Sequence, residues 1–73
     1  MDREKHREQY GRFLEKLKKA REEAGLTQIQ AAQAVCKHQS FTSKIESGER
    51  RIDFVELQEL AHLYKKPLSF FED

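Results

Sequence analysis

The sequence predicts a compact all-α domain, and three features of its 73 residues indicate this fold class. Apolar residues recur every three or four positions, the spacing that gathers them on one face of a helix. Glycines and helix-capping residues divide the periodic segments from one another. No segment alternates apolar and polar residues as a half-buried strand would. A chain of this length folds as one domain with a modest core, so it gains stability from a partner.

The first expected helix has one apolar face that starts at Tyr10 and ends near Ala24. The residues on this face are Tyr10, Phe13, Leu14, Leu17, Ala20 and Ala24. Gly25 follows and is expected to end the helix, because glycine adopts the left-handed C-cap conformation without strain. Residues 1–9 alternate in charge and are expected either to extend this helix as a charged N-terminal segment or to form a frayed arm. The remaining residues, 10–73, are expected to form the compact domain.

A second, short helix is expected to begin after Thr27. Thr27 and Gln30 form a capping-box pattern, in which each side chain accepts a hydrogen bond from the other residue's backbone N–H. The apolar residues of this helix are Ala31, Ala32 and Val35. The adjacent alanines let another helix approach closely, and residues 36–38 are expected to form a tight connection.

The third helix is expected to run roughly from Gln39 to Ser47 and to stop at Gly48. Phe41 and Ile45 lie one helical turn apart within it, which gives it a short apolar stripe.

The fourth helix is expected to start at Asp53, with Glu56 providing an acidic first turn. Its apolar face consists of Phe54, Leu57, Leu60, Ala61 and Tyr64. Two lysines at positions 65 and 66 follow, where the helix dipole favours cations. Pro67 restarts the chain, and the apolar residues after it are expected to form one last helical turn.

Composition argues against a disulfide-bonded, secreted or membrane-spanning protein. The net charge is only +1, although charged residues make up 37% of the chain. The single cysteine cannot form an internal disulfide, which fits a reducing compartment. No apolar run is long enough for a signal peptide or a membrane span, so a cytoplasmic location without membrane contact is expected.

Neither a metal site nor a catalytic site is expected. Cys36 and His38 are close in sequence, but a zinc site needs about four ligands. His6 and His62 lie on other elements, so no second ligand pair accompanies them. A Cys–His catalytic pair would also need an orienting third group and an oxyanion donor. We therefore expect no cofactor and no enzymatic activity.

The middle of the chain resembles a known DNA-binding family. Gly25-Leu26-Thr27-Gln28, then Ala32, then Ile45-Glu46-Ser47-Gly48, has the spacing of the lambda-repressor-like helix-turn-helix family, also called Cro/C1 or XRE-type. The flanks agree: the family's last two helices are matched by Asp53, Phe54, Leu57, Ala61, Leu68 and Phe71. The resemblance covers about residues 10–72.

The resemblance implies a compact five-helix domain in which the third helix enters the major groove. The DNA-binding residues that it implies are Thr27, Gln28, Lys37, Gln39, Ser40, Phe41, Ser43, Lys44 and Arg50. Gln28 would donate to a phosphate, and Arg50 would approach the DNA backbone. Phe41 would contact a thymine methyl group or fold back onto Ile29. The family also implies a largely buried ion pair between Arg21 and Glu46.

The sequence departs from the family at four positions. Cys36 stands where glycine is usual, and we expect a left-handed backbone there. His38 stands where a serine or threonine usually caps the third helix. Ala31 replaces a leucine and Thr42 an aliphatic residue, so the core between the second and third helices is expected to be lighter.

The resulting prediction is a transcriptional regulator, a repressor that binds a palindromic operator in double-stranded DNA as a homodimer. The dimer interface is expected to contain Leu63, Tyr64, Leu68, Phe70 and Phe71. Phage repressors, restriction-modification controllers and antitoxins all remain open as contexts. An alternative is a protein-interaction module, such as an antitoxin-type domain that binds a regulatory protein, with DNA binding secondary or lost.

Overall fold

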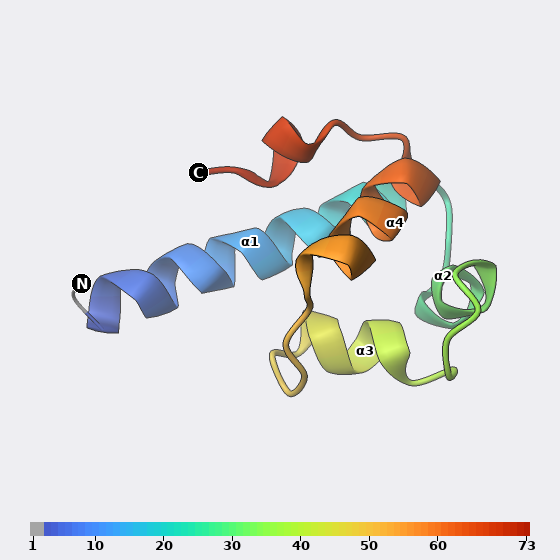
Figure 1. Cartoon of the computed structure of the whole chain (residues 1–73), viewed down its shortest axis with the longest axis horizontal. Helices are drawn as coiled ribbons and strands as arrows, with labels where there is room; N and C mark the ends of the chain where they lie inside the picture. Colours follow the sequence, from blue (N-terminus) through green and yellow to red (C-terminus); the bar gives the residue numbers. More distant parts are fainter. Residues whose placement is uncertain (1–2) are drawn as a thin grey trace.

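The computed structural model describes residues 3–73, which form four α-helices and one short 3-10 helix (Figure 1). The elements are α1 (Arg3–Glu23), α2 (Gln28–Ala34), α3 (Phe41–Glu46), α4 (Phe54–Tyr64) and η1 (Leu68–Phe71). No strand occurs among these residues, and the predicted all-α class is confirmed. The predicted count of five helices needs correction, because η1 is a single 3-10 turn. Its closing bonds run from Phe70 N to Pro67 O and from Glu72 N to Ser69 O, three residues back.

The first helix is the longest element and projects beyond the rest of the domain (Figure 1). It begins at Arg3, so residues 3–9 are helical, whereas residues 1 and 2 lie outside the described part of the chain. Its buried residues, Leu17, Ala20 and Arg21, all lie in its C-terminal half. Gly25 ends the helix with φ of 75°, and Leu26 N bonds back to Arg21 O, as in a glycine C-cap.

The connection from α2 to α3 agrees only in part with the sequence prediction. The capping box of Thr27 and Gln30 is present at the start of α2. Cys36 has φ of 58°, which confirms the expected left-handed backbone. The third helix, however, is shorter than predicted and starts at Phe41 instead of Gln39. The two preceding residues form a turn that is closed by a bond from Phe41 N to His38 O.

The fourth helix has reciprocal capping at its start and a left-handed residue at its end. Asp53 and Glu56 form a complete capping box. Lys65 has φ of 59°, and the next residue, Lys66, donates its N–H to Ala61 O. A non-glycine residue therefore adopts the conformation that glycine usually supplies at this place.

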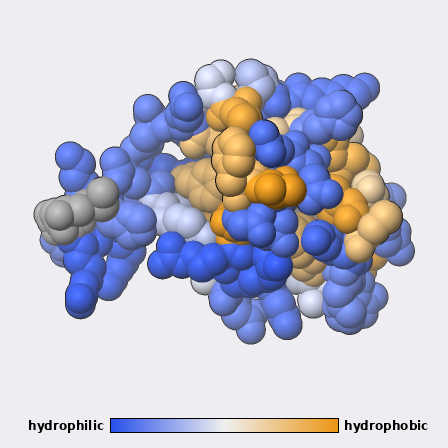
Figure 2. Space-filling view, viewed as in Figure 1, coloured by the Kyte–Doolittle hydropathy of each residue, from blue (hydrophilic) through white to orange (hydrophobic). Residues whose placement is uncertain are grey.

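One core joins all the elements, and Figure 2 shows apolar surface over the body of the domain but polar side chains over the projecting end of α1. The buried apolar residues are Leu17, Ala20, Ala31, Ala32, Phe41, Ile45, Leu60, Ala61, Tyr64 and Phe71. Phe54 was predicted on the buried face of α4 but is 62% exposed. In that first turn of α4 the buried side chain is instead Glu56, whose carboxylate is paired.

Candidate nucleic-acid interface

The outer side of α3 and the turns beside it carry most of the predicted DNA-binding residues. This helix packs against α1 and α2 and buries Phe41, Thr42 and Ile45. The burial of those three side chains leaves Lys44 exposed and Ser43 half-buried on the other side of the helix. Gln39 and Ser40 are in the preceding turn, the first exposed and the second half-buried.

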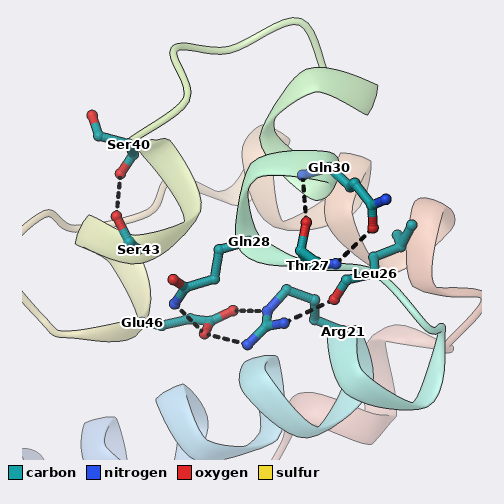
Figure 3. A network of polar contacts seen from close by, with 8 residues as sticks. All are labelled: Arg21, Leu26, Thr27, Gln28, Gln30, Ser40, Ser43 and Glu46. Atoms are coloured by element: carbon teal, nitrogen blue, oxygen red, sulfur yellow. Dashed lines mark hydrogen bonds and ion pairs between the residues drawn. The ribbon is translucent and has the colours of Figure 1, made fainter.

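A buried ion pair fixes the end of α3 to α1. Arg21 Nε donates to Glu46 Oε2 at 2.7 Å and Nη2 donates to Oε1 at 3.1 Å, while the two side chains are only 9% and 6% exposed. Arg21 Nη1 also donates to Leu26 O at 2.8 Å. The hydrogen bonds to Glu46 raise the pKa of Arg21. The Arg21 side chain thus joins α1 both to the end of α3 and to the residue just before the N-cap of α2 (Figure 3).

Gln28 takes part in the same network. Figure 3 shows the side chains of Arg21 and Gln28 converging on Glu46, and Gln28 Nε2 donates to Glu46 Oε1 at 3.0 Å. One of its two amide hydrogens is therefore used within the free protein. The predicted contact with a phosphate requires the other hydrogen or a change of side-chain rotamer.

Phe41 does not belong to the exposed surface. It is 5% exposed, so the predicted contact with a thymine methyl group is wrong. The alternative, a contact of Phe41 with Ile29, stays a prediction; Ile29 itself is 48% exposed. The Phe41 ring instead faces two cations: the guanidinium carbon of Arg50 is 5.0 Å from its centroid and Lys37 Nζ is 5.7 Å away.

An open pocket of about 460 Å³ lies over this ring, and we call it the cationic pocket. It is lined by Lys37, His38, Ser40, Phe41, Lys44 and Arg50. Four of these six residues were predicted from the sequence to contact DNA through exposed polar groups. The cationic pocket therefore brings together residues of the α2–α3 turn, of α3 and of the α3–α4 loop.

Arg50 is largely occupied within the protein. Its Nη1 and Nη2 donate to the two carboxylate oxygens of Glu56 at 2.8 and 2.9 Å, and Nη1 also donates to Arg51 O at 2.9 Å. The Arg50 side chain is 42% exposed, whereas that of Glu56 is 9% exposed. The bonds from Arg50 lower the pKa of Glu56 to about 2. Arg50 thus lines the pocket, and several of its hydrogen-bond donors are used within the protein instead of pointing toward DNA.

A comparison with protein families agrees with this geometry. The family model described as Helix-turn-helix, of the Cro/C1 or XRE type, matches residues 17–71. The chain belongs to this family. Comparison with curated proteins and with solved structures gave no match. Membership makes this helix-turn-helix protein a DNA-binding regulator of the XRE type, in which α2 and α3 are the paired helices.

His38 is a polar residue of the helix-turn-helix unit that the sequence did not mark as functional. Its Nδ1 accepts the backbone N–H of Ser40 at 3.2 Å and lies 2.9 Å from Ser40 Oγ. Since Nδ1 accepts, it carries no hydrogen, and the Ser40 hydroxyl donates to it. The ring thus replaces the usual capping hydroxyl. The absence of a serine or threonine at position 38 was the only sequence signal for this role.

Three further predicted DNA-binding residues have polar groups that already contact other groups of the protein. Thr27 is exposed, but its hydroxyl accepts Gln30 N at 3.1 Å as part of the cap. Lys37 has a side chain that is 36% exposed, and its Nζ lies 3.7 Å from Glu56 Oε2. Ser43 Oγ donates to Ser40 O at 3.0 Å (Figure 3).

The predicted dimer surface is only partly at the surface of this helix-turn-helix protein. Tyr64 is 3% exposed and Phe71 is 6% exposed, so neither is available to a partner. Burial raises the pKa of Tyr64 to about 12, and Phe71 packs edge-on against Phe13 with ring centroids 6.3 Å apart. Both side chains fill the core of the monomer. The predicted residues that keep some exposure are Leu63, Leu68 and Phe70.

No helix among residues 3–73 is long and apolar enough to cross a membrane. The same residues contain no cluster of three or more side chains suited to holding a metal ion.

Proposed function

We propose that this protein is a sequence-specific transcriptional regulator, a repressor, that binds a short inverted repeat in double-stranded DNA as a homodimer. The observation that carries the proposal is the exposed polar surface of α3 and of the turn before it. Lys44 on the helix and Gln39 in the turn are exposed, while a buried ion pair fixes the end of the helix to α1. A rigid helix with exposed donors suits the major groove, because each base pair presents a distinct pattern of donors and acceptors there. Repression requires only that the bound dimer blocks access to its site.

Base reading is assigned to exposed residues of α3 and of the turn just before it. Lys44 can donate to guanine O6 and N7, and the Gln39 amide can pair with adenine N6 and N7. The Ser40 hydroxyl donates to His38, so its oxygen is left to accept a hydrogen bond from adenine N6 or cytosine N4. Ser43 adds a further hydroxyl on the same side.

The backbone contacts are assigned to Thr27, Gln28 and Lys37, which lie in or beside the turns of the helix-turn-helix unit. The net charge is only +1, so few phosphate contacts are available, and each should contribute a large share of the affinity for DNA. Lys37 is the cation best placed for this role, because it lines the cationic pocket and is still partly exposed.

The homodimer is proposed to use apolar side chains that the monomer leaves in water. Phe54 and Val55 are adjacent in the first turn of α4 and are 62% and 63% exposed. Two large exposed apolar neighbours are typical of a contact surface, and a twofold axis is the commonest way to cover them. Two-fold symmetry in turn implies an operator with inverted half-sites.

Selection of bound sequences from a random duplex pool tests the proposal. We expect an inverted repeat whose half-site centres are roughly 10 base pairs apart, because two recognition helices then enter the groove about one turn apart. Lys44→Ala should relax the preference at one base position in each half-site. Lys19→Ala, which removes the same charge from α1, should leave the selected sequence unchanged. Failure to enrich any sequence, together with no binding at low salt, would favour the protein-interaction module.

A further inference from the structure

A buried carboxylate lies behind the cationic pocket and contacts cations from two segments. Glu56 projects from α4, and its two oxygens accept Nη1 and Nη2 of Arg50. Lys37 Nζ approaches Glu56 Oε2 to 3.7 Å from the opposite segment, the α2–α3 turn. One carboxylate thus links the loop that precedes α3 to the loop that follows it.

The aromatic ring of Phe41 contacts the same two cations. Arg50 lies over the ring at 5.0 Å and Lys37 at 5.7 Å, measured to the centroid. Lysine and arginine are long side chains, and ordering them at an interface costs conformational entropy. The carboxylate and the ring together impose much of that order before any ligand binds.

The negative charge of Glu56 is unexpected beside a surface that is proposed to bind DNA. Its pKa is held near 2 by Arg50, so it is ionised at neutral pH beside a surface that is proposed to meet phosphates. A lone carboxylate there would repel DNA. Two cations outnumber it, and Lys37 still has ammonium hydrogens that can donate outward, because lysine carries three donors.

We propose that Glu56 is a positioning residue that fixes Lys37 and Arg50 in the wall of the cationic pocket, so that one DNA backbone phosphate binds there between Lys37 and Lys44. In this arrangement Arg50 braces the wall and Glu56 touches no DNA. The inference rests on the proposed function, since it names the phosphate site of the same interface.

The test compares Glu56→Gln with Glu59→Gln, which removes the same charge from an exposed position on the same helix. In Glu56→Gln the side-chain amide oxygen can still accept the N–H of Asp53, as Glu56 Oε1 does at 3.2 Å. If Glu56 mattered only as a negative charge, its removal would tighten binding to every sequence. Positioning predicts the opposite: specific affinity falls about tenfold, and the salt dependence flattens by about one unit for one lost phosphate contact. Glu59→Gln should change neither quantity.

A double-mutant cycle shows whether Glu56 acts through Lys37. Lys37→Met should weaken operator binding about tenfold in the wild type but less than about twofold in the Glu56→Gln background, because the contact is already lost there. Replacing the phosphate nearest Lys37 by an uncharged methylphosphonate should likewise weaken the wild type and leave Lys37→Met unaffected. Additive losses in the cycle contradict the inference.

Circular dichroism at the assay temperature checks that the variants are folded. If Glu56→Gln is unfolded, Glu56→Asp replaces it: it keeps the charge but shortens the reach to Lys37, so the same loss of salt dependence is expected. Operator binding by the wild type, with unchanged affinity and salt dependence in a folded Glu56 variant, overturns the inference and leaves the proposed function intact. Equal binding of operator and scrambled DNA by the wild type overturns the proposed function, and the inference with it.

Discussion

At the residue scale, a large loss of stability is expected when one partner of the Arg21–Glu46 ion pair is removed. Glu46→Ala leaves the Arg21 guanidinium without its carboxylate in a place where it is 9% exposed. An unpaired buried charge costs about 3–5 kcal/mol, so Glu46→Ala should lower the free energy of unfolding by that amount. Urea denaturation measures it.

Glu49→Ala is the matched control for this prediction, because Glu49 is an exposed acid three residues later. Exposed substitutions of this kind change stability by about 0.5 kcal/mol or less. A loss for Glu46→Ala as small as that of the control would mean that the pair contributes little to folding in solution.

Glu56 should make the stability of the domain fall as the pH is lowered into the acidic range. Its pKa is lowered from 4.5 to about 2 in the folded protein. Its contribution to stability is therefore complete above about pH 4.5 and is lost as the pH falls toward 2. The loss should be about 2 kcal/mol, below the full value of the shift because its partners are partly exposed.

Urea denaturation of wild type and Glu56→Gln at about pH 5 and about pH 2.5 tests this prediction. The wild type should lose more stability over that range than Glu56→Gln does, since the variant has no carboxylate to protonate at this position. The other acidic groups are present in both proteins and cancel in the comparison. Equal losses would show that the Arg50–Glu56 pair is not formed in solution.

At the element scale, the helix ends were predictable where their signals are local. Each of these ends is formed by a few adjacent residues: the caps at the starts of α2 and α4, and the C-cap at Gly25. A short stretch of sequence was therefore enough to predict them. The start of α3 was not predictable, because the turn before it is held by the ring of His38 instead of a usual cap. The left-handed Lys65 likewise carries no glycine signal.

The turn after α2 provides a test of backbone strain. Cys36 has φ of 58°, a conformation that costs a non-glycine residue on the order of 1 kcal/mol. Cys36→Gly removes the strain but makes the unfolded chain more flexible, so the net effect should be neutral or stabilising by up to about 1 kcal/mol. Thermal denaturation measures the change.

Cys36→Ala serves as the control, because alanine keeps the strained conformation and also removes the thiol. It should show no gain in stability. Clear destabilisation by Cys36→Gly, with DNA binding intact, would contradict the strain and indicate that the side chain contributes through packing.

At the scale of the whole molecule, the resemblance predicted the family and sequence periodicity predicted most of the core, but neither predicted every exposed residue. Tyr64 and Phe71 were assigned to a dimer surface because a tail rich in apolar residues looks unpartnered in the sequence. Phe41 was placed on the DNA side because the resemblance puts its position on the helix that enters the groove. Only the packing of distant elements shows that these rings fill the core, while Phe54 is left outside. The pairing of Arg50 with Glu56 was not predicted, because the acidic first turn of the helix already accounted for Glu56.

The assembly prediction follows from that exposed surface. Val55→Asp should shift a dimer toward monomer, because it places a charge in the apolar contact that Phe54 and Val55 are proposed to form. Ile29→Asp, at a 48% exposed position on α2, should leave the assembly unchanged. Sedimentation at micromolar to high micromolar concentration, with and without operator DNA, measures both. A wild type that stays monomeric throughout would contradict the homodimer.

The central claim is that the protein distinguishes one DNA sequence from another through α3. Its most direct test is the affinity of the wild type and Lys44→Ala for the selected operator and for a scrambled duplex, measured across a range of salt concentrations. Operator binding should be at least about 10³-fold tighter than scrambled binding near physiological salt, and Lys44→Ala should lose about 1–3 kcal/mol per half-site on the operator alone. Equal affinity of the folded wild type for the two duplexes would contradict sequence-specific binding through α3.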